Sequence, residues 1–410
     1  MNNKTLLLTR LSHNNPSSRP DTYTIWDSYK YGLEENIEGL IALDYYDLYF
    51  THGKRGFEVE LEKLIKTKNI QYLFISYAAE DFTIDLKFLY RLKQIYKLCI
   101  INTSPDPETF FESRDRYYFQ LADYILPFTI IPKNSLYSFY NISAFTLYSL
   151  YNKNMFISKK LKKEIDVSFT GNLNKANRKE YIEYLQQNGI NVKTYGAGSK
   201  YGFIKHAEMM KVINSSKINL NFTDSAYSTH FDFNTNTNFT LGTKINSRIQ
   251  QAKGRLIEIH LTNSFCLSQE GKGTRDLFDD DRIIFTTKED LLEKINYYLQ
   301  QEEKRETIAQ ELYQQALKFD AANRFKKILP LITYKSQIHE KLYIDKNFIT
   351  DYTSYHFLFF FNFLFKRNFS FAYKESKIFF KYRRFDFKTI FYHFKMQAIY
   401  AIKRYRGIKK

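Results

Sequence analysis

The sequence predicts an α/β protein with two Rossmann-like domains in tandem, followed by a basic, aromatic and helical C-terminal extension. Short β-rich runs alternate with longer stretches of helical apolar spacing, which favours parallel sheets covered by helices on both faces. The alternation restarts near residue 160 after the basic linker ISKKLKKEI, and 410 residues are too many for one core. We therefore expect domains at residues 1–155 and 160–330, with the extension at 331–410.

The first domain opens with an apolar, β-rich run and then alternates helical and strand patterns. Apolar residues at helical spacing precede each later strand, and Pro127 ends the last one. The expected elements are strand TLLLT (5–9), helix 59–69, strand YLFISY (72–77), helix 83–96, strand KLCIINT (97–103), and a helix and a strand within 116–128.

The second domain repeats this alternation. Its first strand ends in a glycine turn, and its first helix has Asn177 as the expected N-cap and Gly189 as its stop. The stretch 226–244 is polar and aromatic without a period, which predicts a long loop. The expected elements are strand 166–173, helix 177–188, strand 192–196, helix 206–217, strand 218–223, helix 247–261, strands 265–268 and 283–287, and two closing helices.

Composition excludes several classes of protein. With 44% hydrophobic residues the chain has enough apolar side chains to fold as a globule. Cys99 and Cys266, its two cysteines, fall inside expected strands and form neither a disulfide framework nor a metal-binding spacing, which suits a reducing cytoplasm. The N-terminal apolar run is too short for a signal peptide, and no run approaches the roughly 20 residues that span a bilayer. We therefore expect a cytoplasmic protein.

Positive charge and aromatic residues are concentrated together at the C-terminal end. The net charge of the chain is +17, of which residues 345–410 carry +11 with 22 Phe and Tyr residues. Basic clusters that alternate with aromatic runs suit an anionic membrane surface, and residues 355–410 are the expected contact. One alternative is nucleic-acid binding, which the pattern favours less. The other is a helical subdomain that packs its Phe side chains against the body.

Four stretches of the second domain carry a family resemblance: DVSFTGNLNKANRKEYIEYL, KGRLIEIHLTNSFCLS, IIFTTKEDLLEKINYYL and KRETIAQELYQQALKFDAANRF. In order and spacing, residues 166–324 resemble the C-terminal domain of the spore-maturation-type and related family 1 bacterial glycosyltransferases. The resemblance implies the GT-B architecture, in which two Rossmann-like domains face each other across a cleft. It also implies a nucleotide-diphosphate sugar as the donor substrate.

The resemblance gives a role to a glutamate among apolar residues, Glu258. In this family the glutamate of the corresponding helix accepts hydrogen bonds from the ribose hydroxyls, and a carboxylate is able to accept both at once. Arg255 belongs to the same pattern, and Lys253 is expected to face the diphosphate. The alternative for Glu258 is a purely structural role, in which it forms an ion pair with Arg255 at i−3. Gln250 stands where many relatives have a second glutamate, and Asn263-Ser264 replace the family's glycine.

Three residues at the start of the second domain are further candidates for the donor site. Gly171 and Asn172 form the strand–helix turn, where backbone amides would approach a phosphate. Arg178, in the first turn of the next helix, would reach the diphosphate, and its alternative is a solvated helix residue. Glycine turns of this kind are also common in α/β proteins without a phosphate ligand.

Candidate catalytic residues come from loops after strands of the first domain. Ligands of open parallel sheets bind beyond the carboxyl ends of the strands. His13, in SHNNPSSRPD, is therefore a candidate general base, and Asp106, in SPDPE, would orient or deprotonate the acceptor; both also fit ordinary turns. FDDDR (278–282) is read as a solvated turn rather than a metal site. We expect no metal or other cofactor, because GT-B enzymes generally stabilise the leaving diphosphate with helix dipoles and basic side chains.

Together these observations predict a glycosyltransferase that moves a sugar from a nucleotide-diphosphate donor to a hydroxyl of a bacterial surface glycan, such as lipopolysaccharide, or its lipid-linked precursor. If the tail binds an anionic membrane, we expect the protein to lie peripherally at the inner face of the cell membrane. Two rival hypotheses are a nucleotide-sugar epimerase on the same fold and a basic nucleic-acid-binding protein. The sequence leaves the donor sugar, the acceptor and the stereochemical outcome open.

Overall fold

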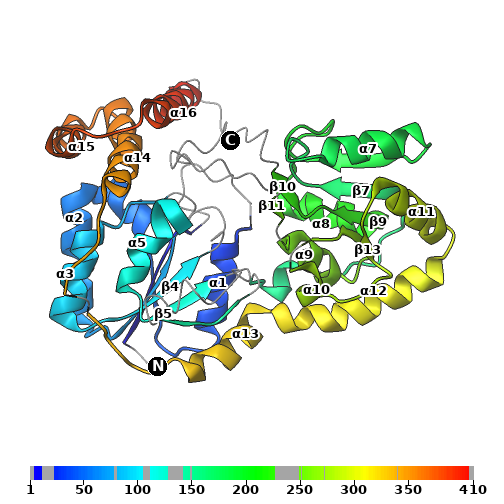
Figure 1. Cartoon of the computed structure of the whole chain (residues 1–410), viewed down its shortest axis with the longest axis horizontal. Coiled ribbons are helices and arrows are strands. Elements are labelled where there is room, and N and C mark those ends of the chain that lie inside the picture. The colour runs from blue at the N-terminus through cyan, green and yellow to red at the C-terminus, as the bar shows by residue number, and fades with distance from the viewer. Residues whose placement is uncertain are drawn as a thin grey trace.

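Two α/β domains lie beside each other in the computed structural model, and three helices of the C-terminal extension cover part of the first (Figure 1). This arrangement confirms the predicted fold class. The structure describes residues 4–11, 23–77, 81–104, 111–127, 142–147, 150–226, 249–250, 252–271, 273–338 and 340–405.

The first domain is built on a parallel sheet with the strand order β2-β1-β3-β4-β5-β6. Leu6 and Leu8 of β1 pack on one face with α2, α3 and the tail, whereas Leu7 packs on the other with α1 and α13. A strand buried on both faces reads as an unbroken apolar run, which is why TLLLT was predictable. The elements are β1 Thr5–Thr9, α1 Ile25–Glu34, β2 Ile41–Asp44, α2 Tyr45–Thr67, β3 Tyr72–Ser76, α3 Leu86–Tyr96, β4 Cys99–Ser104, α5 Arg116–Tyr118, β5 Tyr124–Pro127 and β6 Ser143–Ala144.

The helix expected at 59–69 is only the second half of α2. The chain bends at Gly53, where φ is 67°, a conformation that glycine adopts without a steric penalty. The Asp44 side chain caps the first half by accepting hydrogen bonds from the amides of Tyr46 and Asp47. The sequence pattern missed this first half, together with α1 and β2.

The second domain has a parallel sheet with the strand order β13-β12-β9-β7-β8. The helix expected at 247–261 is shorter than predicted: residues 249–250 form β11, which pairs antiparallel with β10. Gln250 therefore lies in a strand, not in the helix that carries Glu258. The elements are β7 Ile165–Thr170, α7 Arg178–Gln187, β8 Val192–Tyr195, α8 His206–Ser215, β9 Ser216–Asn221, β10 Asp224–Ala226, β11 Ile249–Gln250, α9 Gly254–Leu261, β12 Cys266–Gln269, α10 Thr274–Leu277, β13 Ile284–Phe285, α11 Lys288–Leu299 and α12 Glu302–Ala316.

The chain crosses between the domains twice, and the two crossings run together. The amide of Tyr151 donates to the carbonyl of Phe319 (3.3 Å), and the amide of Ala321 donates to the carbonyl of Tyr151 (2.7 Å). Helix α13 (Ala321–Ile328) then packs on α1, where a Cβ at Gly32 would lie 2.6 Å from the Phe325 ring. The chain thus returns to the first domain before residue 330, the expected domain boundary.

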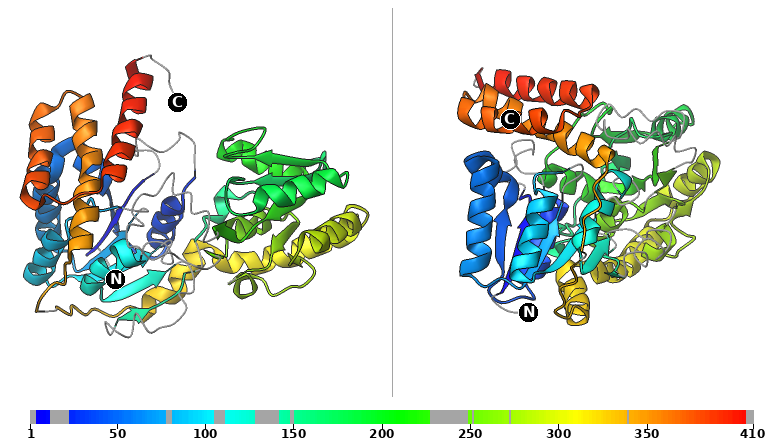
Figure 2. Two further views of the ribbon diagram at one scale, coloured as in Figure 1. Left: turned by 45° about the horizontal axis from the view of Figure 1, so that its top comes forward. Right: turned by 60° about the vertical axis from the view of Figure 1, so that its left-hand side comes forward.

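The extension forms helices α14 (Lys346–Phe365), α15 (Phe369–Tyr382) and α16 (Phe387–Tyr405), which lie over the helices of the first domain (Figure 2). One face of α14 is buried in the core of that domain through Phe348, Tyr352, Tyr355, Phe359 and Phe363. The alternative of a helical subdomain packed on the body is therefore confirmed for α14.

A buried polar cluster also joins the extension to the first domain. The Tyr49 hydroxyl on α2 donates to Oε1 of Glu375 on α15 (2.8 Å), while Oε2 lies 3.0 Å from Nδ1 of His356 on α14. All three side chains are buried, so this cluster fixes how α14 and α15 dock on α2. In the part of the chain that the structure describes, no helix is both long and apolar enough to cross a bilayer.

Candidate active site

The loops that follow the strands of the second domain meet at one edge of its sheet. Gly171 follows β7, and its amide donates to the carbonyl of Tyr195 at the end of β8 (2.8 Å). The amide of Leu173 donates to the carbonyl of Ala197 (2.9 Å). At Gly196 φ is 117°, and a Cβ there would lie 2.0 Å from the Gly171 carbonyl oxygen. Glycines are required here because two loops pack backbone against backbone.

This packing changes what the predicted glycine turn offers to a ligand. The amides of Gly171 and Leu173 are already hydrogen-bonded within the domain. The side chain of Asn172 accepts a hydrogen bond from the amide of Asn174 (2.9 Å). Helix α7 begins only at Arg178, so the turn does not lie at a helix N-terminus. Contact of Gly171 and Asn172 with a phosphate stays a prediction.

Arg178 is buried, which differs from the solvated residue that was its alternative. Its Nη1 donates to the carbonyl of Asn172 (3.0 Å), and its Nη2 donates to those of Phe222 (3.3 Å) and Asp224 (3.0 Å). Burial lowers the pKa of the guanidinium to about 10, with a smaller opposing effect from the Asp224 charge. The side chain therefore holds together the loops that follow β7 and β9, and its predicted contact with a diphosphate is untested.

Helix α9 brings Glu258 and Arg255 together. Four apolar residues fix the inner face of the helix: Leu256, Ile257, Ile259 and Leu261. On the remaining face Arg255 forms an ion pair with Oε2 of Glu258, and its Nη1 lies 2.7 Å from the Met209 sulfur on α8. The i−3 pairing considered from the sequence is thus present. It occupies one carboxylate oxygen, and the Glu258 side chain is 19% exposed, so the pair leaves room for a ligand contact.

Tyr23 of the first domain reaches this part of the second domain. Its ring centroid lies 5.3 Å from that of Phe156 and 5.5 Å from that of His206, and its hydroxyl oxygen accepts a hydrogen bond from the amide of Asn152 (2.8 Å). Burial and, more weakly, the nearby charge of Glu258 raise the pKa of Tyr23. Glu258 therefore lies near enough to the junction of the domains for its charge to act on Tyr23. No sequence pattern pointed to Tyr23, because only the folded chain brings it there.

In the first domain, the predicted catalytic residues His13 and Asp106 lie outside the residues that the structure describes. The described residues at the carboxyl ends of β1 and β3 include Arg10 and Asp81, whose side chains approach to 3.6 Å. The fully buried Asp81 carboxylate also accepts hydrogen bonds from the hydroxyls of Tyr45 (2.7 Å) and of Tyr355 on α14 (3.1 Å). The tail helix α14 thus helps to build the carboxyl edge of the first sheet.

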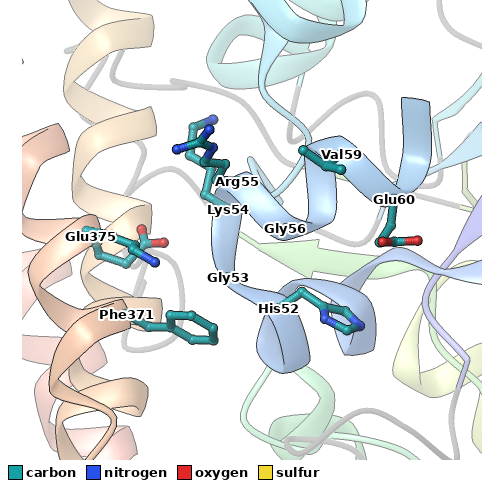
Figure 3. Close-up of a pocket in the computed structure, with 10 residues that line it drawn as sticks. His52, Gly53, Lys54, Arg55, Gly56, Val59, Glu60, Phe371 and Glu375 are labelled. Carbon is teal, nitrogen blue, oxygen red and sulfur yellow. The ribbon is translucent and has the colours of Figure 1, made fainter. Parts of the chain in front are cut away.

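Two cavities of the described residues lie away from these strand ends. One, of about 300 Å³, lies between the bend of α2 and α15 (Figure 3). The other, of about 830 Å³, lies at the opposite edge of the second sheet, beside the linker lysines 159–163. The predicted donor residues therefore lie at the strand-end loops and on α9, outside both cavities.

The acidic stretch 278–282 forms ion pairs instead of a metal site. Arg275 pairs with Asp279 and Asp281, and Arg282 pairs with Asp280. Within the described ranges, no group of three or more His, Cys, Asp or Glu side chains is placed to hold a metal ion. The expectation of metal-independent chemistry remains a prediction.

Comparison with known families and structures agrees with this geometry. Residues 175–330 match the family described as glycosyl transferase-like. No curated protein sequence is detectably similar to the chain.

Among similar solved structures, sucrose-phosphate synthase from Thermosynechococcus elongatus has a TM-score of 0.53 at 9% identity, over 80% of this chain and 97% of the other. HepE from Anabaena, solved with UDP-glucose, has a TM-score of 0.52 at 12% identity, over 80% and 98%. A glycosyltransferase from Rickettsia africae has a TM-score of 0.50 at 10% identity, over 80% and 97%. These likenesses confirm the GT-B fold, and the family match confirms that the second domain is glycosyltransferase-like.

Proposed function

We propose that this chain, a glycosyltransferase-like protein of the GT-B fold, moves a sugar from a nucleotide-diphosphate donor to a hydroxyl of a bacterial surface glycan or its lipid-linked precursor. The second domain holds the donor and the first holds the acceptor. The observation that carries this proposal is the position of Glu258. It lies partly exposed on α9, inside the family-matched segment and near Tyr23 of the other domain.

Glu258 binds the ribose of the donor. Its carboxylate accepts hydrogen bonds from the two hydroxyls, while the ion pair with Arg255 holds it in place. Arg255 and Lys253, at the start of α9, are close enough in sequence and space to favour a nearby diphosphate. HepE, a similar structure, was solved with UDP-glucose, which supports a nucleoside-diphosphate sugar as the donor class.

The acceptor hydroxyl attacks the anomeric carbon, and the nucleoside diphosphate leaves. In an inverting reaction the hydroxyl loses its proton to a general base, for which His13 and Asp106 are the candidates. Basic side chains and the amino end of α9 stabilise the charge that develops on the leaving diphosphate. Closure of the two domains brings donor and acceptor together. A lipid-linked acceptor would keep the enzyme at the inner face of the cell membrane.

A thermal-shift screen with UDP-, GDP-, CMP- and dTDP-sugars tests the donor assignment. A ligand at 100 times its Kd stabilises a protein by about 2.7 kcal/mol, so one nucleotide family is expected to raise Tm clearly. Glu258→Ala is expected to abolish that rise, whereas Glu293→Ala on the surface of α11 serves as the matched control. No shift with any nucleotide, or equal shifts in Glu258→Ala and wild type, would contradict the proposal.

A further inference from the structure

We propose that the outward faces of α15 and α16, two helices that both pack on α14, together bind an anionic lipid bilayer. Their apolar part, the aromatic stripe, consists of side chains that are 52% to 94% exposed: Phe369, Tyr373 and Phe380 on α15, and Phe387, Phe391, Ile402 and Tyr405 on α16. The segment is narrower than residues 355–410, because α14 is buried against the first domain.

The aromatic stripe follows the period of the helices. At about 100° per residue, Phe369, Tyr373 and Phe380 fall within an arc of about 40° on α15. The four members on α16 fall within an arc of about 60°. Apolar residues scattered by chance would not align in this way on two consecutive helices, so the stripe is a defined apolar face on each.

The inner faces of the same helices are already occupied. Phe379 of α15 stacks on Phe357 of α14 with ring centroids 3.7 Å apart. Gln397 of α16 accepts a hydrogen bond from Asn362 of α14 (2.9 Å). The aromatic stripe is therefore additional to the apolar surface that holds the three helices together, and it faces away from the core.

Positive charge flanks the aromatic stripe. On α15 the exposed lysines Lys374, Lys377 and Lys381 lie on the next sector of the helix, and among the described residues no ion pair engages them. The two acidic residues of 366–405 are both engaged within the protein. Glu375 is buried with Tyr49 and His356. Asp386 caps α16 by accepting a hydrogen bond from the Thr389 amide (2.8 Å). The surface is thus basic without exposed acidic neighbours on these helices.

The cavity between α2 and α15 extends this basic region toward the body of the first domain. Its lining includes Lys54 and Arg55 at the bend of α2, together with Lys374 of α15. Figure 3 shows Phe371 and Glu375 of α15 facing that bend. Lys54 pairs with Glu58 and Asp85, and Glu60 also lines the cavity, so among the described residues it is Arg55 and Lys374 that add positive charge here without an ion pair.

These features fit a lipid surface better than a nucleic acid. A helix that lies in a membrane interface combines an apolar face with lysine and arginine beside it and buries that face by about 5–10 Å. Nucleic-acid sites instead line a positively charged groove with aromatic rings on which bases stack. Here the rings protrude from two helices. Four of the seven stripe residues are Phe, which has no polar group to form hydrogen bonds with water or with a nucleic acid.

The position of the surface links it to the acceptor. Helix α14 carries α15 and α16 and also places Tyr355 on Asp81 at the carboxyl end of the first sheet. A bilayer bound at the stripe would therefore contact the acceptor-side domain. This role in delivering a lipid-linked acceptor rests on the proposed function, whereas binding to the bilayer does not.

Sedimentation of the full chain with vesicles tests the surface directly. The wild type is expected to pellet with phosphatidylcholine vesicles that contain 30% phosphatidylserine and to bind vesicles of phosphatidylcholine alone much more weakly. F380S/F387S/F391S is expected to lose more than about tenfold in affinity. K374A/K377A/K381A is expected to lose on the order of 100-fold, from about fivefold for each lysine.

Matched variants control for charge and exposure elsewhere. F203S removes an exposed aromatic residue from the second domain, and K66E/K68E alters exposed lysines at the far end of α2; both are expected to bind vesicles like the wild type. Near-ultraviolet circular dichroism checks that each variant is folded. The thermal shift with nucleotide sugars, measured on the same variants, is expected to equal that of the wild type. A failure of the membrane proposal is therefore distinguished from a failure of the proposed donor binding.

Two results would overturn the inference. One is vesicle binding that is absent in the wild type or equal in the wild type and the aromatic variant. The other is a wild type that does not bind vesicles but binds a 30-nucleotide single-stranded RNA tightly and in a salt-sensitive way. If the same substitutions abolish that RNA binding, the surface is assigned to nucleic acid.

Discussion

Replacing Arg178 by alanine separates a structural role of this side chain from a role in donor binding. The buried guanidinium donates three hydrogen bonds, to the carbonyls of Asn172, Phe222 and Asp224. If its main role is to hold the strand-end loops, its loss must weaken the folded second domain even when no ligand is present.

The size of the effect follows from two opposing contributions. A hydrogen bond to a charged group contributes about 1.5–3 kcal/mol, so three contribute roughly 4.5–9 kcal/mol. Against this, the burial that lowers the pKa of Arg178 to about 10 costs the charged form about 3 kcal/mol, and alanine removes that cost. The expected net loss in the free energy of unfolding is therefore about 3 kcal/mol.

Urea unfolding followed by circular dichroism measures this loss. Lys179→Ala is the matched control, because the neighbouring side chain is 72% exposed and its removal is expected to change stability by less than about 0.5 kcal/mol. The reasoning is refuted if Arg178→Ala unfolds at the urea midpoint of the control but loses more than about tenfold in affinity for the nucleotide. That result would make Arg178 a ligand of the diphosphate.

Two further predictions concern the second domain. Gly196→Ala is expected to lower the free energy of unfolding in urea by more than about 2 kcal/mol, because its Cβ would lie 2.0 Å from the Gly171 carbonyl oxygen. Gly189→Ala is the control: φ is 80° there but no atom lies near the new Cβ, so the expected loss is about 1 kcal/mol. Equal losses in the two variants would contradict the packing argument. Burial lowers the pKa of His260 to about 3, below its unfolded value of about 6.5, so stability is full above pH ~6.5 and falls by up to about 1.4 kcal/mol per pH unit below it. His260→Leu is expected to flatten this dependence in unfolding measured from pH 7 to 4, and an unchanged slope would exclude His260 as its source.

The elements that were predictable from sequence are those whose pattern is set locally. β1 and β3 are apolar runs buried on both faces, and α3 has apolar residues on one side only. The first half of α2 was missed because its helix depends on packing with the tail, where Tyr49 stacks on Phe359 with centroids 4.0 Å apart. Partners that lie more than 300 residues away in sequence leave no periodic signal of their own.

The candidate site shows the same division. Glu258 and Arg255 are three residues apart on one helix, so their pairing follows from helical geometry alone. The burial of Arg178 was not predictable, because it depends on where the loops after β7 and β9 end. Composition likewise fails to separate core from surface in the tail: Phe359 of α14 is buried, whereas Phe380 of α15 is 73% exposed.

The paired crossings at Tyr151 and Asp320 have a mechanical consequence. Two separate connections would let the domains twist or slide against each other in several directions. Here the crossings are joined by backbone hydrogen bonds on both sides of Tyr151, so they behave as one short ribbon that resists stretching and shear but bends across its width. Any change in the angle between the domains would therefore bend both crossings together, with Tyr151 and Asp320 moving as a pair.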